Sequence, residues 1–125
     1  MGWFNDSNER QQKLEHVFSG REPLDDLELW ENYFRRLGVA LDTVARVRRI
    51  LSEILEADLL RIRDTDDFSK ELAFFWDLDS FADVEIVQAL EKEFHIRITD
   101  AEAAAMKTLR DIVLGVHLKT ITQAP

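Results

Sequence analysis

Apolar residues recur every three or four positions along nearly the whole chain, which predicts a protein built from helices. In the N-terminal part, Asp6 or Ser7 is a candidate N-cap for a first helix that ends before Gly20. Pro23 favours the start of a second helix, which Gly38 ends. The apolar face expected to turn this second helix toward the rest of the chain consists of Leu27, Trp30, Phe34 and Leu37.

A third helix follows, and its apolar and charged positions separate cleanly onto two faces. Asp42 or Thr43 is its candidate N-cap. Its apolar face consists of Val44, Val47, Ile50, Leu51, Ile54 and Leu55. The long connection that comes next, residues 57–79, contains three adjacent aromatic residues, Phe74, Phe75 and Trp76. Adjacent aromatic side chains lower solubility if they are exposed, so we expect packing, with contact to a bound group as the alternative.

The clearest helical pattern begins at Ser80 and reaches Phe94. At 100° per residue, its expected buried arc consists of Val84, Ile86, Val87, Leu90 and Phe94. Asp100 is the candidate cap of a short helix, and Thr108 with Asp111 matches a capping box at the start of the last helix. The face of that last helix consists of Leu109, Ile112, Val113 and Val116. Strand-like alternation never exceeds a few residues, so the predicted fold class is all-α.

Residues 79–113 resemble the acyl carrier protein family. The run Asp79-Ser80-Phe81 is similar to the family's Asp-Ser-Leu motif, in which the serine carries a phosphopantetheine arm. Residues 82–94 match the family's second helix without a gap, and residues 96–102 and 108–113 resemble the stretches that lead into its third and fourth helices. The resemblance implies a four-helix acyl-carrier-like bundle with an N-terminal helical extension.

The implied organisation has three parts. Residues 1–38 form the N-terminal helical extension, residues 39–120 the four-helix domain, and residues 121–125 a C-terminal tail. The extension has no counterpart in the family. We expect its second helix to dock on the bundle through the apolar face named above, and the alternative is that it is presented to a partner.

By resemblance, the chain is a carrier protein and not an enzyme. Ser80 takes a 4'-phosphopantetheine arm from coenzyme A through a phosphopantetheinyl transferase, and the arm holds an acyl or aminoacyl thioester for enzymes of a fatty-acid, polyketide or other specialised pathway. A helix N-terminus suits the phosphodiester, because unpaired N–H groups and the helix dipole favour negative charge there. Asp79 keeps the region polar. Considered alone, Ser80 or Asp79 would be a simple N-cap.

The resemblance also implies a face for partner enzymes. It consists of Phe81, Asp83, Val84, Glu85, Gln88 and Glu91, with Glu93 beside it. Carboxylates around an apolar anchor suit a basic docking surface, because opposite charges speed the encounter. A solvated charged face is the alternative for these residues. An unmodified interaction module, which keeps the fold without the arm, is the alternative function.

Two further departures from the family bear on function. The loop before Ser80 is four residues longer than the family's, and the added residues include the aromatic run. Lys92 and Arg97 stand where the family tends to be acidic. These two basic residues reduce the acidity of the face and favour a specialised set of partners.

Charge and composition exclude several other functions. The net charge is −9, and residues 64–125 alone carry 13 acidic and 6 basic residues, which disfavours binding to nucleic acid. There is no cysteine, and His16, His95 and His117 lie in no metal-ligand motif, so we expect no metal site. No apolar run is long enough to span a membrane and no signal pattern is present, so a cytoplasmic protein is expected. We also expect the chain to be a monomer.

Overall fold

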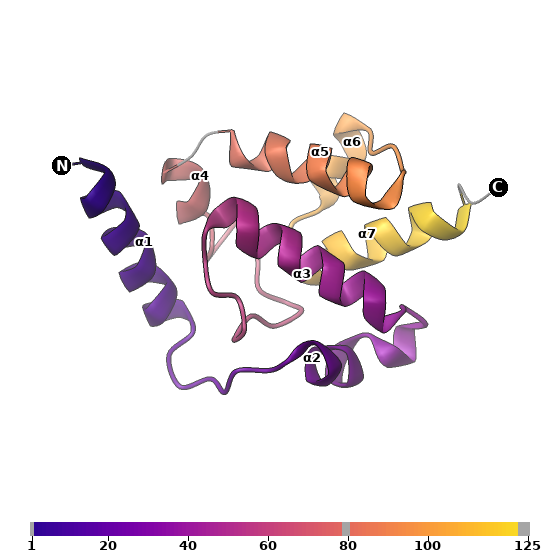
Figure 1. The fold of residues 1–125 in the computed structure, drawn as a ribbon, viewed down its shortest axis with the longest axis horizontal. Coiled ribbons are helices and arrows are strands. Elements are labelled where there is room, and N and C mark those ends of the chain that lie inside the picture. The colour runs from indigo at the N-terminus through magenta and orange to yellow at the C-terminus, as the bar shows by residue number, and fades with distance from the viewer. Residues whose placement is uncertain (1, 79–80, 123–125) are drawn as a thin grey trace.

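The computed structural model describes residues 2–78 and 81–122, and within these ranges the chain is helical (Figure 1). No strand occurs in the described ranges, and the predicted all-α class is confirmed. The elements are α1 (Gly2–Val17), α2 (Asp26–Tyr33), a 3₁₀ helix η1 (Arg35–Leu37), α3 (Leu41–Leu55), α4 (Phe74–Leu78), α5 (Ala82–Phe94), α6 (Asp100–Ala105) and α7 (Leu109–Thr122). None of the described helices is both long and apolar enough to cross a membrane.

The bundle is organised around α3, which packs against α2, α5 and α7 (Figure 1). Its apolar residues repeat at helical spacing, and Val44, Val47, Ile50, Leu51 and Leu55 are buried. The predicted face of α7 is also buried, through Leu109, Ile112, Val113 and Val116. Together α3, α5, α6 and α7 form the four-helix arrangement that the sequence predicted.

Several helices begin at other residues than predicted. The first helix already includes Gly2, ahead of the candidate caps Asp6 and Ser7. The second is capped by Asp25, whose carboxylate accepts from the Glu28 N–H while Glu28 bonds back to the Asp25 N–H, so Pro23 precedes it. Both errors in the predicted helix starts have the same cause: several neighbouring residues are able to cap each helix, and the sequence does not distinguish among them.

The start of α3 is also different from the prediction. Ala40 is the N-cap and makes no side-chain hydrogen bond, so Asp42 and Thr43 already lie inside the helix. Thr43 is buried on the face of α3 that packs on the core, so its side chain is not at the helix end where a cap would lie.

The caps of the two C-terminal helices are local capping boxes. Thr99, one residue before the predicted Asp100, caps α6 through a reciprocal pair of bonds with Glu102. The predicted box of Thr108 and Asp111 at α7 is confirmed by hydrogen bonds of 3.0 and 3.1 Å.

The predicted docking of α2 on the bundle is confirmed for Trp30, Phe34 and Leu37, and it is wrong for Leu27. Phe34 and Leu29 are fully buried, and the Trp30 indole donates to the Val39 carbonyl at 2.7 Å. Leu27, expected on the docked face, is 48% exposed. Leu29, two residues further along α2, is buried in its place, because α2 meets α3 with that side of the helix turned inward.

Arginine side chains tie the N-terminal extension to the connection between α3 and α4, residues 56–73. Arg21 makes a bidentate pair with the buried Asp66, at 2.6 and 3.0 Å. This hydrogen bonding raises the pKa of Arg21. Asp66 also accepts from the Arg63 N–H at 2.7 Å. The long connection is therefore fixed by its own side chains, as a loop of this length requires.

Candidate functional site

The two residues of the attachment motif, Asp79 and Ser80, lie outside the described residues. The residue that follows them, Phe81, is described, and it immediately precedes α5. The candidate site is therefore built from the described residues that follow Ser80 in the sequence, which are the N-terminal turns of α5, and from the elements that pack against them.

The outer face of α5 is exposed at the residues nearest Ser80. Phe81 is 70% exposed and Val84 50% exposed, and Asp83, Glu85 and Gln88 are also exposed. The buried ridge of the helix consists of Ala82, Ile86, Leu90 and Phe94. The prediction that Val84 belongs to the buried arc is wrong. The buried residues of α5 are four positions apart, and Val84 lies halfway between two of them, at the edge of the buried face.

The carboxylates of α5 fall into two groups. Asp83 and Glu85 take part in no ion pair with any other residue that the structure describes. Glu91, by contrast, accepts from the Ile98 N–H at 2.9 Å, so it also fixes the segment after α5. Glu93 pairs with Arg46 and Arg49, and the hydrogen bond from Arg46, followed by that from Arg49, lowers the pKa of Glu93.

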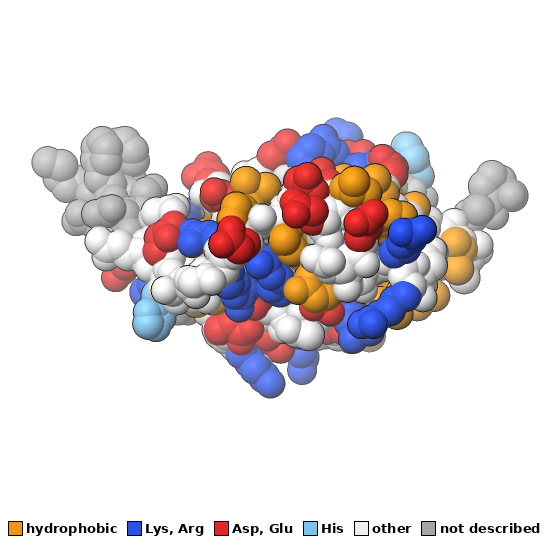
Figure 2. Space-filling model, turned by 90° about the horizontal axis from the view of Figure 1, so that it is seen from below, with side chains coloured by type: hydrophobic (Ala, Val, Ile, Leu, Met, Phe, Trp, Pro, Cys, Tyr) orange, Lys and Arg blue, Asp and Glu red, His pale blue; other side chains and the backbone are white. Residues whose placement is uncertain are grey.

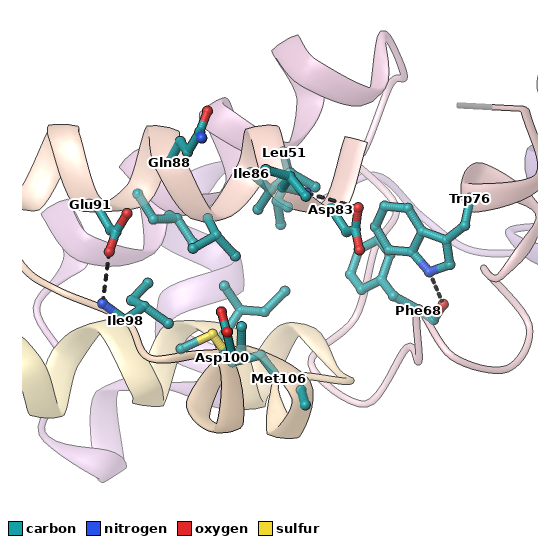
Figure 3. A pocket seen from close by; sticks show the side chains of 16 residues that line it. Leu51, Phe68, Trp76, Asp83, Ile86, Gln88, Glu91, Ile98, Asp100 and Met106 are labelled. Atoms are coloured by element: carbon teal, nitrogen blue, oxygen red, sulfur yellow. Dashed lines mark hydrogen bonds between the residues drawn. The ribbon is translucent and has the colours of Figure 1, made fainter. Parts of the chain in front are cut away.

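A cleft of about 510 Å³ lies between α5 and α6, beside this exposed face (Figure 3). Its apolar lining includes Leu51, Ile86, Leu90, Ile98, Met106 and Ile112. Three carboxylates also line it: Asp83, Glu91 and Asp100. The cleft contains no lysine, arginine or histidine among its described lining residues, so an apolar group fits its chemistry better than an anion does.

Trp76 of the aromatic run, which lies in α4, is found at one end of this cleft. Phe74 and Phe75 are buried, as predicted, and their rings lie 4.6 Å apart. Trp76 is half-buried and lines the cleft together with Phe68. The sequence did not identify Phe68 as part of the site, and a single apolar residue in a polar connection gave little signal.

The described residues fit a phosphopantetheine arm at the position before Phe81. A modifying enzyme needs to reach that position, and the exposure of Phe81 and Asp83 leaves this end of α5 at the surface. A cargo on the arm needs an apolar shelter, and the cleft begins beside Asp83. For metal ions, no cluster of three or more potential ligands occurs in the described part of the chain.

Comparison with known proteins agrees with this geometry. Residues 45–115 match the family described as "Phosphopantetheine attachment site". The acyl carrier protein of Caulobacter vibrioides is 37% identical over 79 residues, which is 63% of this chain and 96% of that protein. That of Cylindrotheca sp. is 36% identical over 78 residues, 62% of this chain and 92% of that protein.

A third relative comes from another setting. Polyketide-8 synthase acyl carrier protein 2 of Streptomyces avermitilis is 31% identical over 65 residues, 52% of this chain and 70% of that protein. All these alignments cover most of the relative, and the family match covers more than half of this chain. The chain therefore belongs to the acyl carrier protein family: it is a non-catalytic carrier protein whose covalent cofactor is 4'-phosphopantetheine.

Proposed function

We propose that Ser80 carries the phosphopantetheine arm, that the arm holds an acyl thioester, and that the chain delivers this thioester to separate enzymes. The observation that carries the proposal is the pairing of an exposed apolar anchor with an apolar cleft at one end of α5. Phe81 and Val84 are exposed, and the cleft, which Val84 also lines, runs along the same helix. Both features begin directly after Ser80, where an arm would start.

The outer face of α5 is proposed as the docking face for partners, with Phe81, Asp83, Val84, Glu85, Gln88 and Glu91 as its residues. Asp83 and Glu85 are available to external cations, since neither is used in an ion pair with a described residue. A partner with a basic surface would be attracted to them, and Phe81 would add apolar contact. The partners are a phosphopantetheinyl transferase and synthase or acyl-transferring enzymes.

The pathway is proposed from the names of relatives. Some are named simply as acyl carrier proteins, and one as an acyl carrier protein of a polyketide synthase. A fatty-acid, polyketide or other specialised pathway in the cytoplasm is the setting we propose. Within the chain, residues 1–38 are the extension, 39–120 the carrier domain and 121–125 a tail, and the protein acts as a monomer.

The test is the transfer of phosphopantetheine from coenzyme A by a transferase of broad specificity, followed by mass measurement. We expect one phosphopantetheine per chain and one new thiol. Because the chain has no cysteine, a thiol-reactive label reports the arm alone. Ser80→Ala should abolish labelling, whereas Ser69→Ala, which removes an exposed serine elsewhere in the chain, should leave it unchanged.

The same measurement tests the alternative of an unmodified interaction module. Wild-type chain that stays unmodified with several different transferases would contradict attachment at Ser80. In that case the exposed face of α5 would be the remaining functional feature, and the interaction module would be the better account.

A further inference from the structure

Two features that set this chain apart from its family, the N-terminal extension and the aromatic run before Ser80, contact each other in the fold. The family match covers residues 45–115, so α1 lies outside it. Among the described helices, α4 is the one that α1 contacts most, and Figure 1 shows the two side by side. Because α4 consists of Phe74–Leu78, it contains the whole aromatic run. The extension therefore packs on the segment that directly precedes the attachment motif.

The helix α1 is itself anchored to the rest of the chain. Leu14 on α1 is 1% exposed and belongs to the core. Arg10 donates to the Leu55 carbonyl at the end of α3, at a distance of 2.8 Å. Glu15 pairs with Arg61 of the connection at 2.6 Å. These contacts give α1 a fixed position from which it can hold α4.

The helix α4 depends on its neighbours because it is too short to be stable alone. It has five residues, whereas isolated helices shorter than about 12 residues are marginal in water. Phe74 and Phe75 are buried, and the ammonium group of Lys13 on α1 lies 5.9 Å from the centre of the Phe74 ring. The Trp76 indole donates to the Phe68 carbonyl at 2.7 Å. Thus α4 is held by α1 and by the connection.

The order of α4 matters for any enzyme that acts on the attachment motif. The helix ends at Leu78, and the motif follows it directly in the sequence. If α1 left α4, the two buried phenylalanines would lose cover and the short helix would unfold. An enzyme that binds there would then have to order these residues, at a cost in conformational entropy that weakens binding.

We propose that α1 is a positioning element for the attachment reaction. Docked on α4, it keeps the residues before the motif ordered in advance, so that the phosphopantetheinyl transferase binds the chain without having to order them. Residues 74–78 and α1 then act as one unit, which explains why the aromatic run and the extension occur together in this chain. This inference rests on the proposed attachment at Ser80.

The test measures two properties of the full chain. The first is deuterium exchange of the Phe75 and Trp76 backbone amides, which donate to the Leu72 and Ala73 carbonyls. Their exchange rates are divided by those of buried amides in α3, so that a loss of overall stability cancels. The second property is the pair of constants kcat and KM of the transferase for the chain, with coenzyme A in excess.

Leu14→Asp should separate α1 from α4, because it places a charge on the buried face of α1. We expect the relative exchange of the two α4 amides to rise at least about tenfold. The KM should rise about tenfold, because the transferase now has to order α4 when it binds. The kcat should change by less than about twofold, because the same ordered complex then reacts.

Two control variants separate this effect from charge and from stability. Gln11→Asp adds the same charge to α1 at an exposed position. Leu29→Ala removes a leucine of α2 that is 0% exposed, so it weakens the core without changing α1. Both variants should leave the relative exchange of α4 and the KM within about twofold of the wild type. If Leu14→Asp does not fold by circular dichroism, Leu14→Ala replaces it, with the same directions of change and a smaller rise in KM.

A folded Leu14→Asp variant with unchanged exchange in α4 would overturn the dependence of α4 on α1. Faster exchange in α4 together with an unchanged KM would overturn the positioning role, as would a Leu29→Ala variant that raises the KM equally. A wild-type chain that no transferase modifies gives a different result. That outcome contradicts attachment at Ser80, while the exchange measurement still decides whether α1 orders α4.

Discussion

The second helix and the first turns of α5 carry the same kinds of side chain. The large apolar residues of α2 are buried against the bundle, whereas those at the start of α5 are exposed to solvent. Both combine large apolar residues with aspartate and glutamate. At the end of α2, Phe34 is fully buried against the bundle, as is Leu29. At the start of α5, Phe81 is 70% exposed and Val84 is 50% exposed.

This difference in burial goes together with the presence of an arginine beneath α2 and the absence of an ion-pairing arginine at the start of α5 among the described residues. Arg48 of α3 is buried beneath α2, donates to the carboxylate of Asp26 at 2.6 Å and also donates to the Leu24 carbonyl. On the face of the molecule where α2 lies, basic and acidic side chains are intermixed (Figure 2). Asp83 and Glu85 have no such arginine among the described residues. A partner that supplies arginine could cover α5 as α3 covers α2.

Removing residues 1–38 is the strongest test of the covered side. The truncation deletes Leu14, Phe18, Leu29 and Phe34 from the core, and each contributes about 1.5–3 kcal/mol through burial. We expect the melting temperature to fall by about 20 °C or cooperative unfolding to be lost. Thermal unfolding followed by circular dichroism measures this. An unchanged melting temperature together with a monomeric truncated chain would argue against docking.

Matched phenylalanine substitutions compare the two sides directly. Phe34→Ala should lower the free energy of unfolding by about 3–5 kcal/mol, as expected for a fully buried ring. Phe81→Ala should change it by less than about 0.5 kcal/mol, because the ring is exposed. It should instead weaken binding to the transferase by about tenfold or more, as the loss of an apolar anchor does. Urea denaturation and a binding titration give both values; equal stability losses would remove the contrast.

Two neighbouring arginines test the part played by charge. Arg48→Met leaves the Leu24 carbonyl without its donor, and we expect a loss of about 1–3 kcal/mol. Arg49→Met removes an exposed pair with Glu93 and should cost about 1 kcal/mol at most. Unfolding of the two variants under identical conditions measures the difference. A greater loss in Arg49→Met would show that burial of the arginine is not what matters.

Acid should weaken the Glu93 contacts, and this is the smallest expected effect. The pKa of Glu93 lies below its ordinary value of 4.5 in the folded chain, chiefly through Arg46 and then Arg49. The unfolded chain therefore takes up this proton first as the pH falls, so the stability from Glu93 is present above pH 4.5 and is lost below it. Glu93→Gln should flatten the decline in melting temperature below that pH. About 1 M salt should also flatten this decline in the wild type, because the ion pairs of Glu93 with Arg46 and Arg49 are partly exposed. If neither Glu93→Gln nor salt changes the decline, Glu93 does not contribute to it.

The sequence predicts those parts of the fold that depend on neighbouring residues. The capping box of Thr108 and Asp111 was found because both partners lie within one turn. The buried face of α7 was found because its apolar residues repeat at 3.6-residue spacing. Exposure of Phe81, Asp83, Glu85 and Gln88 was likewise expected from the resemblance.

Features set by contacts between distant segments could not be predicted. Leu27 and Leu29 are both apolar, and only the way α2 meets α3 decides which of them is buried. The position of Val84 at the edge of the buried ridge depends in the same way on the rotation of α5. The cleft itself joins residues of α3, α5, α6 and the connection, so no local pattern indicates it.

The connection before α4 has few helical residues, but its backbone amides are bonded to a distant part of the chain. The Phe68 N–H donates to the Lys107 carbonyl, and the Leu109 and Arg110 N–H groups donate to Asp66 and Asp64 carbonyls. Fraying of a single helix end cannot break these bonds; the connection and the start of α7 must separate together. Their amide hydrogens should therefore exchange with deuterium at one common, slow rate. On the time scale of exchange, we expect the connection to behave as part of the core.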